Sequence, residues 1–149
     1  MSVKAIPEGY HTVTPYLIVK GALEAIAFYK KAFGAEELYH MDGPDGLVAH
    51  AEIKIGNCVL MLADEMATHK GPNTLGGTSV SLMIYIEDCD TVFKRALAAG
   101  ATQVEPLEDK FYGDRAGQVK DPFGHVWAIG THVEDVSPEE MEKRMAEMA

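Results

Sequence analysis

The chain has 149 residues, of which 47% are hydrophobic, and it carries a formal net charge of −10. This length suffices for one well-buried core or for two small modules that share one, and the negative charge argues against nucleic acid or an anionic membrane as a partner. No apolar run approaches the roughly 20 residues that a membrane-spanning helix needs, and the N-terminus lacks the apolar stretch of a secretory signal, so we expect a cytoplasmic protein.

The first half of the chain predicts one strand, one helix and three more strands. Val13–Val19 is rich in β-formers, and Pro15 limits this strand to an edge or first position. Gly21–Phe33 shows apolar residues at helical spacing, and the glycine that follows fits the end of a helix. The three further strands are expected at Glu36–Met41, Leu47–Ile55 and Cys58–Ala63. In the second of them the alternation places His50 and Glu52 on the face opposite the apolar residues.

The second half repeats this order. We expect a linker over Asp64–Gly77 and a tail helix that starts at Ser137. Between them the pattern predicts a strand, a helix starting at Asp88 or Asp90, and a second strand. A polar stretch broken by glycines follows, then a return that begins at Val119, and then the last strand. Their expected bounds are Ser79–Ile86 for the first strand, up to Ala99 for the helix, Thr102–Leu107 and His125–Thr131 for the strands, and Asp109–Gly117 for the polar stretch.

Two segments of the chain show nearly the same pattern, a strand, a helix and a glycine that ends the helix. Residues 14–35 begin Thr-Pro-Tyr-Leu-Ile-Val and end Lys-Ala-Phe-Gly-Ala, whereas residues 81–101 begin Ser-Leu-Met-Ile-Tyr-Ile and end Leu-Ala-Ala-Gly-Ala. Such an internal duplication suggests two similar modules that meet across a pseudo-two-fold axis. A cleft lined by both modules is then the natural place for a function.

Several short motifs resemble one known family. The pair Phe28-Tyr29, the stretch Tyr112-Gly113-Asp114-Arg115, the run Asp121–Trp127 and the ending Thr131–Ser137 are similar to those of the vicinal oxygen chelate superfamily. Within it, the chain looks like the PhnB-like branch of the glyoxalase/bleomycin-resistance proteins. The resemblance implies a single α+β domain of two βαβββ modules, whose cupped mixed sheets carry helices on the convex side, followed by a C-terminal helix. The expected bounds are 12–64 and 78–132 for the modules, 65–77 for the linker and 133–149 for the tail.

The same resemblance implies a divalent metal held by one residue from each of four strands, usually His, Gln or Glu. Carried over by strand position, these places fall on Thr14, Met61, Ser81 and Ala128. None of the four is a good ligand for a divalent metal ion, because hydroxyls bind weakly when unaided, a thioether prefers soft ions and alanine has no donor. We therefore expect no cofactor. The alternative is an enzyme, a lyase, isomerase or dioxygenase, whose metal site is rebuilt around His50 and Glu52.

Without a metal, the side chains that face the cup become candidates for binding a ligand. They are Thr14, Tyr16, His50, Glu52, Met61, Ser81, Met83 and Tyr85. Methionine adapts to irregular shapes, and aromatic walls with a few polar groups suit a bulky organic ligand. The competing interpretation is a core filled by its own side chains.

A second candidate patch comprises Phe111, Tyr112, Asp114 and Arg115. Arg115 would either clamp an anionic group or pair with Asp114 or Glu108 as part of the structure. Trp127 is expected in the core, packed toward the helix layer.

These observations favour a small-molecule binding protein that acts without a metal. It would sequester or recognise an aromatic or partly cationic organic compound in a cleft between two copies of the chain. We accordingly expect a homodimer, because closed two-fold dimers are the commonest assembly. No nucleic acid and no membrane is expected as a partner.

Overall fold

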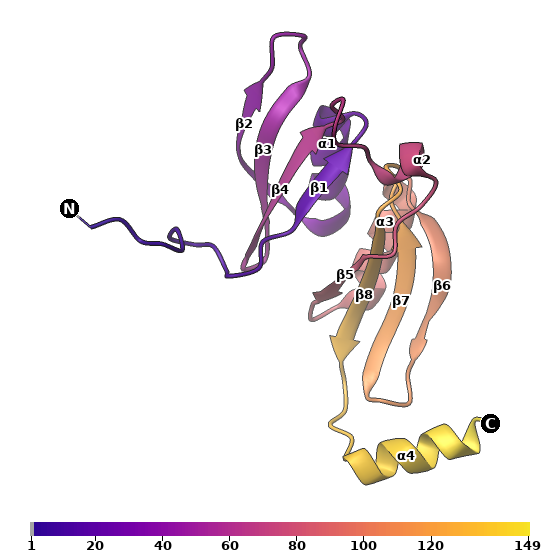
Figure 1. Cartoon of the computed structure of the whole chain (residues 1–149). Coiled ribbons are helices and arrows are strands. Elements are labelled where there is room, and N and C mark those ends of the chain that lie inside the picture. The colour runs from indigo at the N-terminus through magenta and orange to yellow at the C-terminus, as the bar shows by residue number, and fades with distance from the viewer. Residues whose placement is uncertain (1) are drawn as a thin grey trace. The chain divides into compact units, whose positions relative to one another are not determined.

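The computed structural model describes residues 2–149, which form two compact units, each built on a four-stranded sheet (Figure 1). The first unit runs to Thr78 and includes the turn Pro122–Gly124, whereas the second comprises Ser79–Asp121 and His125–Ala149. No helix in this described part of the chain is long and apolar enough to cross a membrane.

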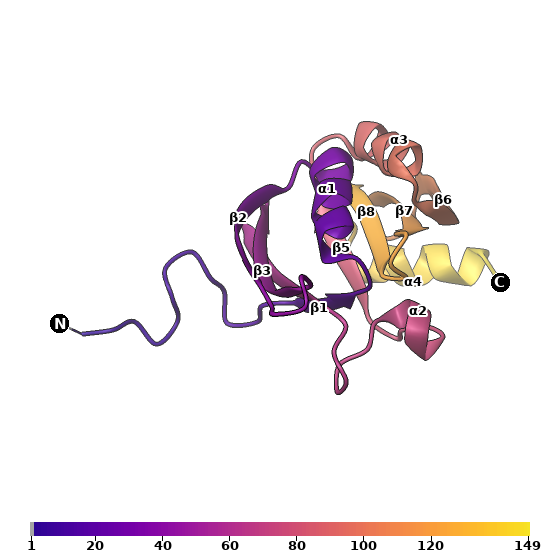
Figure 2. The ribbon, with the colours of Figure 1, turned by 90° about the horizontal axis from the view of Figure 1, so that it is seen from above.

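The first unit has the expected βαβββ order. Its elements are β1 (Tyr16–Val19), α1 (Ala22–Phe33), β2 (Glu36–Asp42), β3 (Val48–Ile55) and β4 (Cys58–Asp64). The strands are arranged β1-β4-β3-β2, with β1 parallel to β4 and the other pairs antiparallel. β1 is therefore an edge strand, as its preceding Pro15 predicts. Figure 2 shows α1 lying along one face of this sheet.

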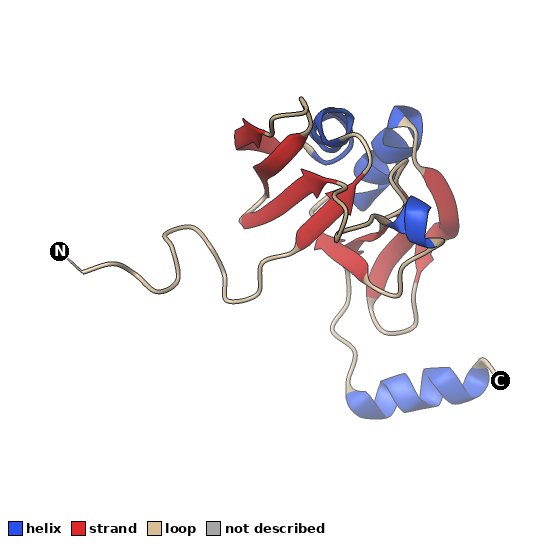
Figure 3. Ribbon diagram, turned by 45° about the horizontal axis from the view of Figure 1, so that its top comes forward, coloured by secondary structure: helices blue, strands red, loops and turns tan. Residues whose placement is uncertain are grey.

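The second unit has the same topology. Its elements are β5 (Ser81–Tyr85), α3 (Cys89–Ala99), β6 (Thr102–Asp109), β7 (Asp114–Lys120), β8 (Val126–His132) and α4 (Pro138–Glu147). The strand order β5-β8-β7-β6 reproduces that of the first unit, again with one parallel pair, β5 with β8. Figure 3 separates the two layers by colour, with the sheets in red and the helices in blue. The expected α+β fold of two mixed sheets with helices and a C-terminal helix is confirmed.

The expected linker between the modules contains secondary structure that its sequence did not predict. Met66 and His69 form an isolated antiparallel bridge, and Pro72–Leu75 forms the single turn α2. Both lie within the first unit.

The core of each unit lies between its sheet and its helix. On the first sheet, alternate residues on the α1 face are buried: Leu17, Val19, Ala51, Ile53 and Leu62. On the second, Trp127 is 1% exposed, lies opposite Val119 in the register and shares its strand face with Ile129. Its indole Nε1–H donates to Asp121 Oδ2 at 2.8 Å. The prediction that Trp127 belongs to the core is confirmed.

The prediction that the return strand begins only at Val119, after a polar stretch over Asp109–Gly117, is wrong. This strand, β7, already begins at Asp114. Gly117 lies inside this strand, where a Cβ atom would come within 2.7 Å of Phe93 Cε2 and 2.9 Å of the Leu107 backbone nitrogen. A glycine within a strand often marks such a close approach. Gly117 therefore allows close packing against Phe93 of α3 and does not break the strand.

In each unit, a side chain at the end of the last strand accepts hydrogen bonds from backbone N–H groups at the start of the helix. Asp64, at the end of β4, accepts the backbone N–H groups of Gly21 and Ala22 at 2.8 Å. At the equivalent place on β8, the Thr131 hydroxyl accepts the N–H of Cys89 at 3.1 Å. The internal duplication thus preserves the position of the cap while its chemistry changes from a carboxylate to a hydroxyl.

Candidate functional site

The face of the first sheet turned away from α1 carries a group of polar and aromatic side chains. Tyr16 on β1 pairs with Met61 on β4, and Met61 pairs with Glu52 on β3. Glu52 pairs in turn with Tyr39 on β2. His50 lies two residues from Glu52, so it shares this face, whereas the residues between and beyond them are buried toward α1. The alternation in the sequence therefore assigned His50 and Glu52 to the correct face.

Hydrogen bonds connect these side chains into one chain of contacts. The Tyr16 hydroxyl lies 2.9 Å from His50 Nδ1, and His50 Nε2 lies 2.8 Å from Glu52 Oε2. Tyr39 also donates its hydroxyl to Glu52 Oε2, at 3.2 Å. The rings of Tyr16 and Tyr39 tilt against the imidazole, with centroid distances of 5.5 and 5.9 Å.

Glu52 is the buried centre of this group, with only 4% of its surface exposed. Burial raises the pKa of its carboxyl, and burial together with the nearby Tyr39 raises the pKa of the Tyr16 phenol. Tyr10, which precedes the first strand, covers Glu52 and donates its hydroxyl to Oε1. Neither Tyr10 nor Tyr39 was predicted to belong here; the signal for Tyr39 was its position on the neighbouring strand, while nothing local marked Tyr10.

A pocket of about 350 Å³ opens beside this group, at the end of β1 and β4. Tyr16 and Ile18 contribute from β1, because residues two apart on a strand share a face. The remaining lining residues are Ala63, Asp64, Met66 and His69. The walls are mainly apolar, and the polar side chains among them are those of Tyr16, Asp64 and His69. A volume of this size lies in the range that binds small organic molecules.

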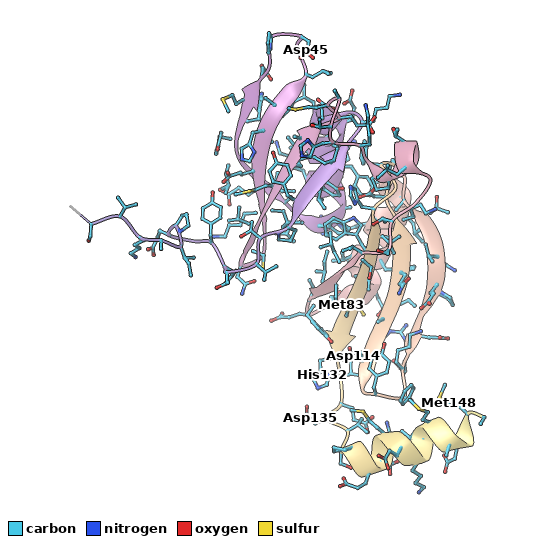
Figure 4. The ribbon with its side chains drawn as sticks, viewed as in Figure 1. Asp45, Met83, Asp114, His132, Asp135 and Met148 are labelled. Carbon is cyan, nitrogen blue, oxygen red and sulfur yellow. The ribbon has the colours of Figure 1, made fainter. Side chains whose placement is uncertain are left out.

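The second sheet carries a different polar cluster, seen in Figure 4 where β7 and β8 approach the tail. Tyr85 donates to Asp114 Oδ2 at 2.7 Å, and His132 Nδ1 lies 2.8 Å from Asp114 Oδ1. His132 Nε2 lies 2.7 Å from Asp135 Oδ1. The hydrogen bonds to Asp135 and Asp114 raise the pKa of His132, and the bond to Asp114 raises the pKa of Tyr85. Both imidazole nitrogens face carboxylate oxygens, an arrangement that favours the protonated form of His132.

The structure divides the predicted patch at residues 111–115 between two faces of β7. Asp114 joins the His132 cluster, whereas Arg115 turns to the other face and holds Asp90 with two hydrogen bonds, of 2.8 and 2.9 Å. Arg115 also binds Asp109 at 3.3 Å. The expected pairing of Arg115 with Asp114 or Glu108 is therefore wrong, although its interpretation as a structural ion pair agrees with these contacts.

The other two members of that patch contact each other. The rings of Phe111 and Tyr112 meet edge to face with a centroid distance of 5.3 Å. Of the remaining predicted lining residues, Ser81 is exposed and Met83 is 43% exposed on β5. The Thr14 hydroxyl donates to the backbone oxygen of His11 at 3.0 Å.

The residues at the four places carried over from the family do not fit a divalent metal ion. Ala128 lies between Met83 on β5 and Gln118 on β7, and Ser81 lies opposite Val126, so Gln118 is the one potential metal ligand among these register partners. Between residues 2 and 149, no three His, Cys, Asp or Glu side chains gather in a way that could hold a metal. His50 and Glu52 form only a pair, and their donor atoms already bind tyrosines and each other.

The fold belongs to a recognisable class. Residues 10–129 match the Glyoxalase/Bleomycin resistance protein/Dioxygenase superfamily, and the chain is a member of that superfamily. A relative, the uncharacterized protein Mb0911c of Mycobacterium bovis, is 44% identical over 139 residues, which cover 90% of this chain and 91% of the relative.

Solved structures agree on the fold. A PhnB protein from Bacillus cereus aligns with a TM-score of 0.64 and 23% identity, covering 81% of this chain and 99% of the other. FosX, a fosfomycin resistance protein from Listeria monocytogenes solved with Mn(II) and sulfate, aligns with a TM-score of 0.62 and 18% identity. That alignment covers 87% of this chain and 95% of FosX.

Proposed function

We propose that the protein binds a small aromatic or partly cationic organic compound, and that it does so without a metal ion. The observation that carries this proposal is the pocket of about 350 Å³ on the first unit, with its apolar walls and the polar side chains of Tyr16, Asp64 and His69. Superfamily membership supports a small-molecule function, and the donor-poor residues Met61 and Ala128 support binding without a metal.

The charge of the chain favours a cationic ligand. The net charge of −10 attracts cations over distance. At the pocket itself, the Tyr16 ring provides an aromatic face, and aromatic faces attract cations by about 0.5–2 kcal/mol. An aromatic cation would combine this attraction with burial against Ile18 and Met66.

A thermal-shift comparison of two ligands of similar size tests the proposal. We expect N-methylquinolinium, a cation, to stabilise the EDTA-treated protein, and naphthalenesulfonate, an anion, to do so much less. A ligand at about 1,000 times its Kd stabilises by about 4.1 kcal/mol, which is easily measured. Tyr16→Ala should remove the shift, whereas Tyr85→Ala, the matched control on the second unit, should retain it. Equal shifts with both ligands, or none, would refute the proposal.

The proposal includes a homodimer in the cytoplasm. Each sheet exposes large apolar side chains on the face away from its helix, among them Tyr39 at 49% and Met41 at 55% on the first and Tyr85 at 61% on the second. Exposed apolar patches of this kind are typical of interfaces. Sedimentation at micromolar concentration should give the mass of two chains; a monomer would contradict this part.

The alternative is an enzyme that binds a metal at His50 and Glu52. Its support is the 2.8 Å approach of His50 Nε2 to Glu52 Oε2 on one sheet face. Metal analysis of protein purified without chelators decides between the two. A stoichiometric transition metal that is lost in His50→Ala would favour the enzyme, and its absence from both would favour the binding protein.

A further inference from the structure

We propose that Tyr16, His50 and Glu52 form a hydroxyl–imidazole–carboxylate relay that makes the Tyr16 oxygen a nucleophile toward an electrophilic aryl compound in the pocket. The inference rests on the proposed binding pocket and adds a covalent activity to it. The Tyr16 side chain connects the two features, because it lines the pocket and its hydroxyl contacts His50.

The hydrogen-bond partners determine where the protons lie. Glu52 accepts from Tyr10 on one oxygen and from Tyr39 on the other, and its ionised carboxylate can only accept. Where Glu52 is ionised, His50 Nε2, at 2.8 Å from it, carries the proton of that contact. In the neutral imidazole Nδ1 then holds a lone pair, so it accepts the Tyr16 hydroxyl at 2.9 Å.

This order of groups is that of an activated nucleophile. A weakly acidic hydroxyl is activated when an adjacent base accepts its proton and a third group orients that base. Here His50 is the base and Glu52 is the positioning residue. The raised pKa of the Tyr16 phenol is consistent with this arrangement, since a phenol that stays neutral needs a base to react.

The structure contains its own controls. Tyr39 is 49% exposed, nearly the same as Tyr16 at 48%, and Tyr85 is 61% exposed. The hydroxyls of both controls donate to a carboxylate, Tyr39 to Glu52 and Tyr85 to Asp114, whereas the Tyr16 hydroxyl lies against an imidazole nitrogen. In the monomeric chain, a faster reaction of Tyr16 than of these two tyrosines therefore cannot come from exposure alone, so the rates are compared at a concentration where sedimentation shows a monomer.

The step is balanced without any further reactant. With an aryl sulfonyl fluoride, the Tyr16 oxygen forms a bond to sulfur, the sulfur–fluorine bond breaks and fluoride leaves. The phenolic proton passes to His50 Nδ1 and from there to water. The product is a sulfonate ester on Tyr16, which is stable enough for peptide mapping.

The test is the rate at which benzenesulfonyl fluoride modifies each tyrosine of the full chain, followed by mass spectrometry of its peptides. Tyr16 should react at least about tenfold faster than Tyr39 and Tyr85, since general-base assistance contributes about 10²–10⁴-fold. His50→Gln should lower the Tyr16 rate to that of Tyr39. Glu52→Gln should lower the Tyr16 rate while the thermal shift with N-methylquinolinium persists.

Three results would overturn the relay: similar rates for the three tyrosines in the native chain, modification of His50 in place of Tyr16, or an unchanged Tyr16 rate in His50→Gln. The comparison within the native chain needs no variant to fold. Tyr16→Phe keeps the ring and should still bind N-methylquinolinium. Retained binding with unselective labelling therefore refutes the relay alone, whereas lost binding in the native chain refutes the pocket.

Discussion

Removal of the Asp64 carboxylate should destabilise the first unit far more than removal of an ordinary helix cap. Asp64 is 6% exposed, and its two oxygens accept three backbone N–H groups, those of Gly21, Ala22 and Val48, each at 2.8 Å. Ala22 is 0% and Val48 1% exposed, so water cannot readily replace the lost acceptor at these two. One side chain thus joins the start of α1 to the start of β3.

The magnitude follows from the two contacts that water cannot replace. A buried donor left without a partner costs about 1–3 kcal/mol, so Asp64→Ala should cost about 2–6 kcal/mol. Asp64→Asn keeps one acceptor oxygen and should cost about 1–3 kcal/mol. The matched control is Asp88→Ala, because Asp88 caps α3 through Thr91 alone and is solvent-exposed. A cap of this kind is worth about 1 kcal/mol.

Urea unfolding followed by circular dichroism gives the change in unfolding free energy for each variant. Amide hydrogen exchange then shows where it arises, and the amides of α1 and β3 should lose protection before those of α3. A cost for Asp64→Ala that equals that of Asp88→Ala would refute the reasoning. So would an equal loss of protection in both helices.

Two further predictions concern the second unit. Gly117→Ala should destabilise it by about 1–3 kcal/mol, measured by urea unfolding, because the new methyl group would overlap Phe93 and the β6 backbone; a neutral effect would mean that α3 can move away. The second prediction concerns His132, whose pKa is raised in the folded state because Asp135 and Asp114 accept hydrogen bonds from its imidazole. Its contribution to stability is therefore complete below the unfolded-state pKa of about 6.5, and it is lost as the pH rises through the higher folded-state pKa. The urea midpoint of the native chain should therefore fall relative to that of His132→Gln as the pH rises above about 6.5, and parallel pH profiles would contradict the assignment.

The fold could be predicted from the sequence because its signals are local. Pro15 indicated an edge strand, and the alternation through β3 assigned His50 and Glu52 to one face. The internal duplication indicated two units of the same topology. The start of β7 was missed because Gly117 reads as a turn until Phe93 is known to pack against it.

The contacts of the site depend on residues distant in the chain, which local patterns do not reveal. Asp64 binds Ala22, 42 positions away, and Arg115 binds Asp90, 25 positions away. The nearer carboxylate, Asp114, was a reasonable partner for Arg115, but neighbours on a strand point to opposite faces. Tyr10 reaches Glu52 from a segment without any periodic pattern.

Methyl NMR of the EDTA-treated protein, titrated with N-methylquinolinium, tests the central claim most directly. The account predicts that the methyl signals of Ile18, Ala63 and Met66 shift in a saturable way, while that of the core residue Ile129 does not. The contrary result is a spectrum in which these three methyl groups respond only after a divalent metal is added, or do not respond at all.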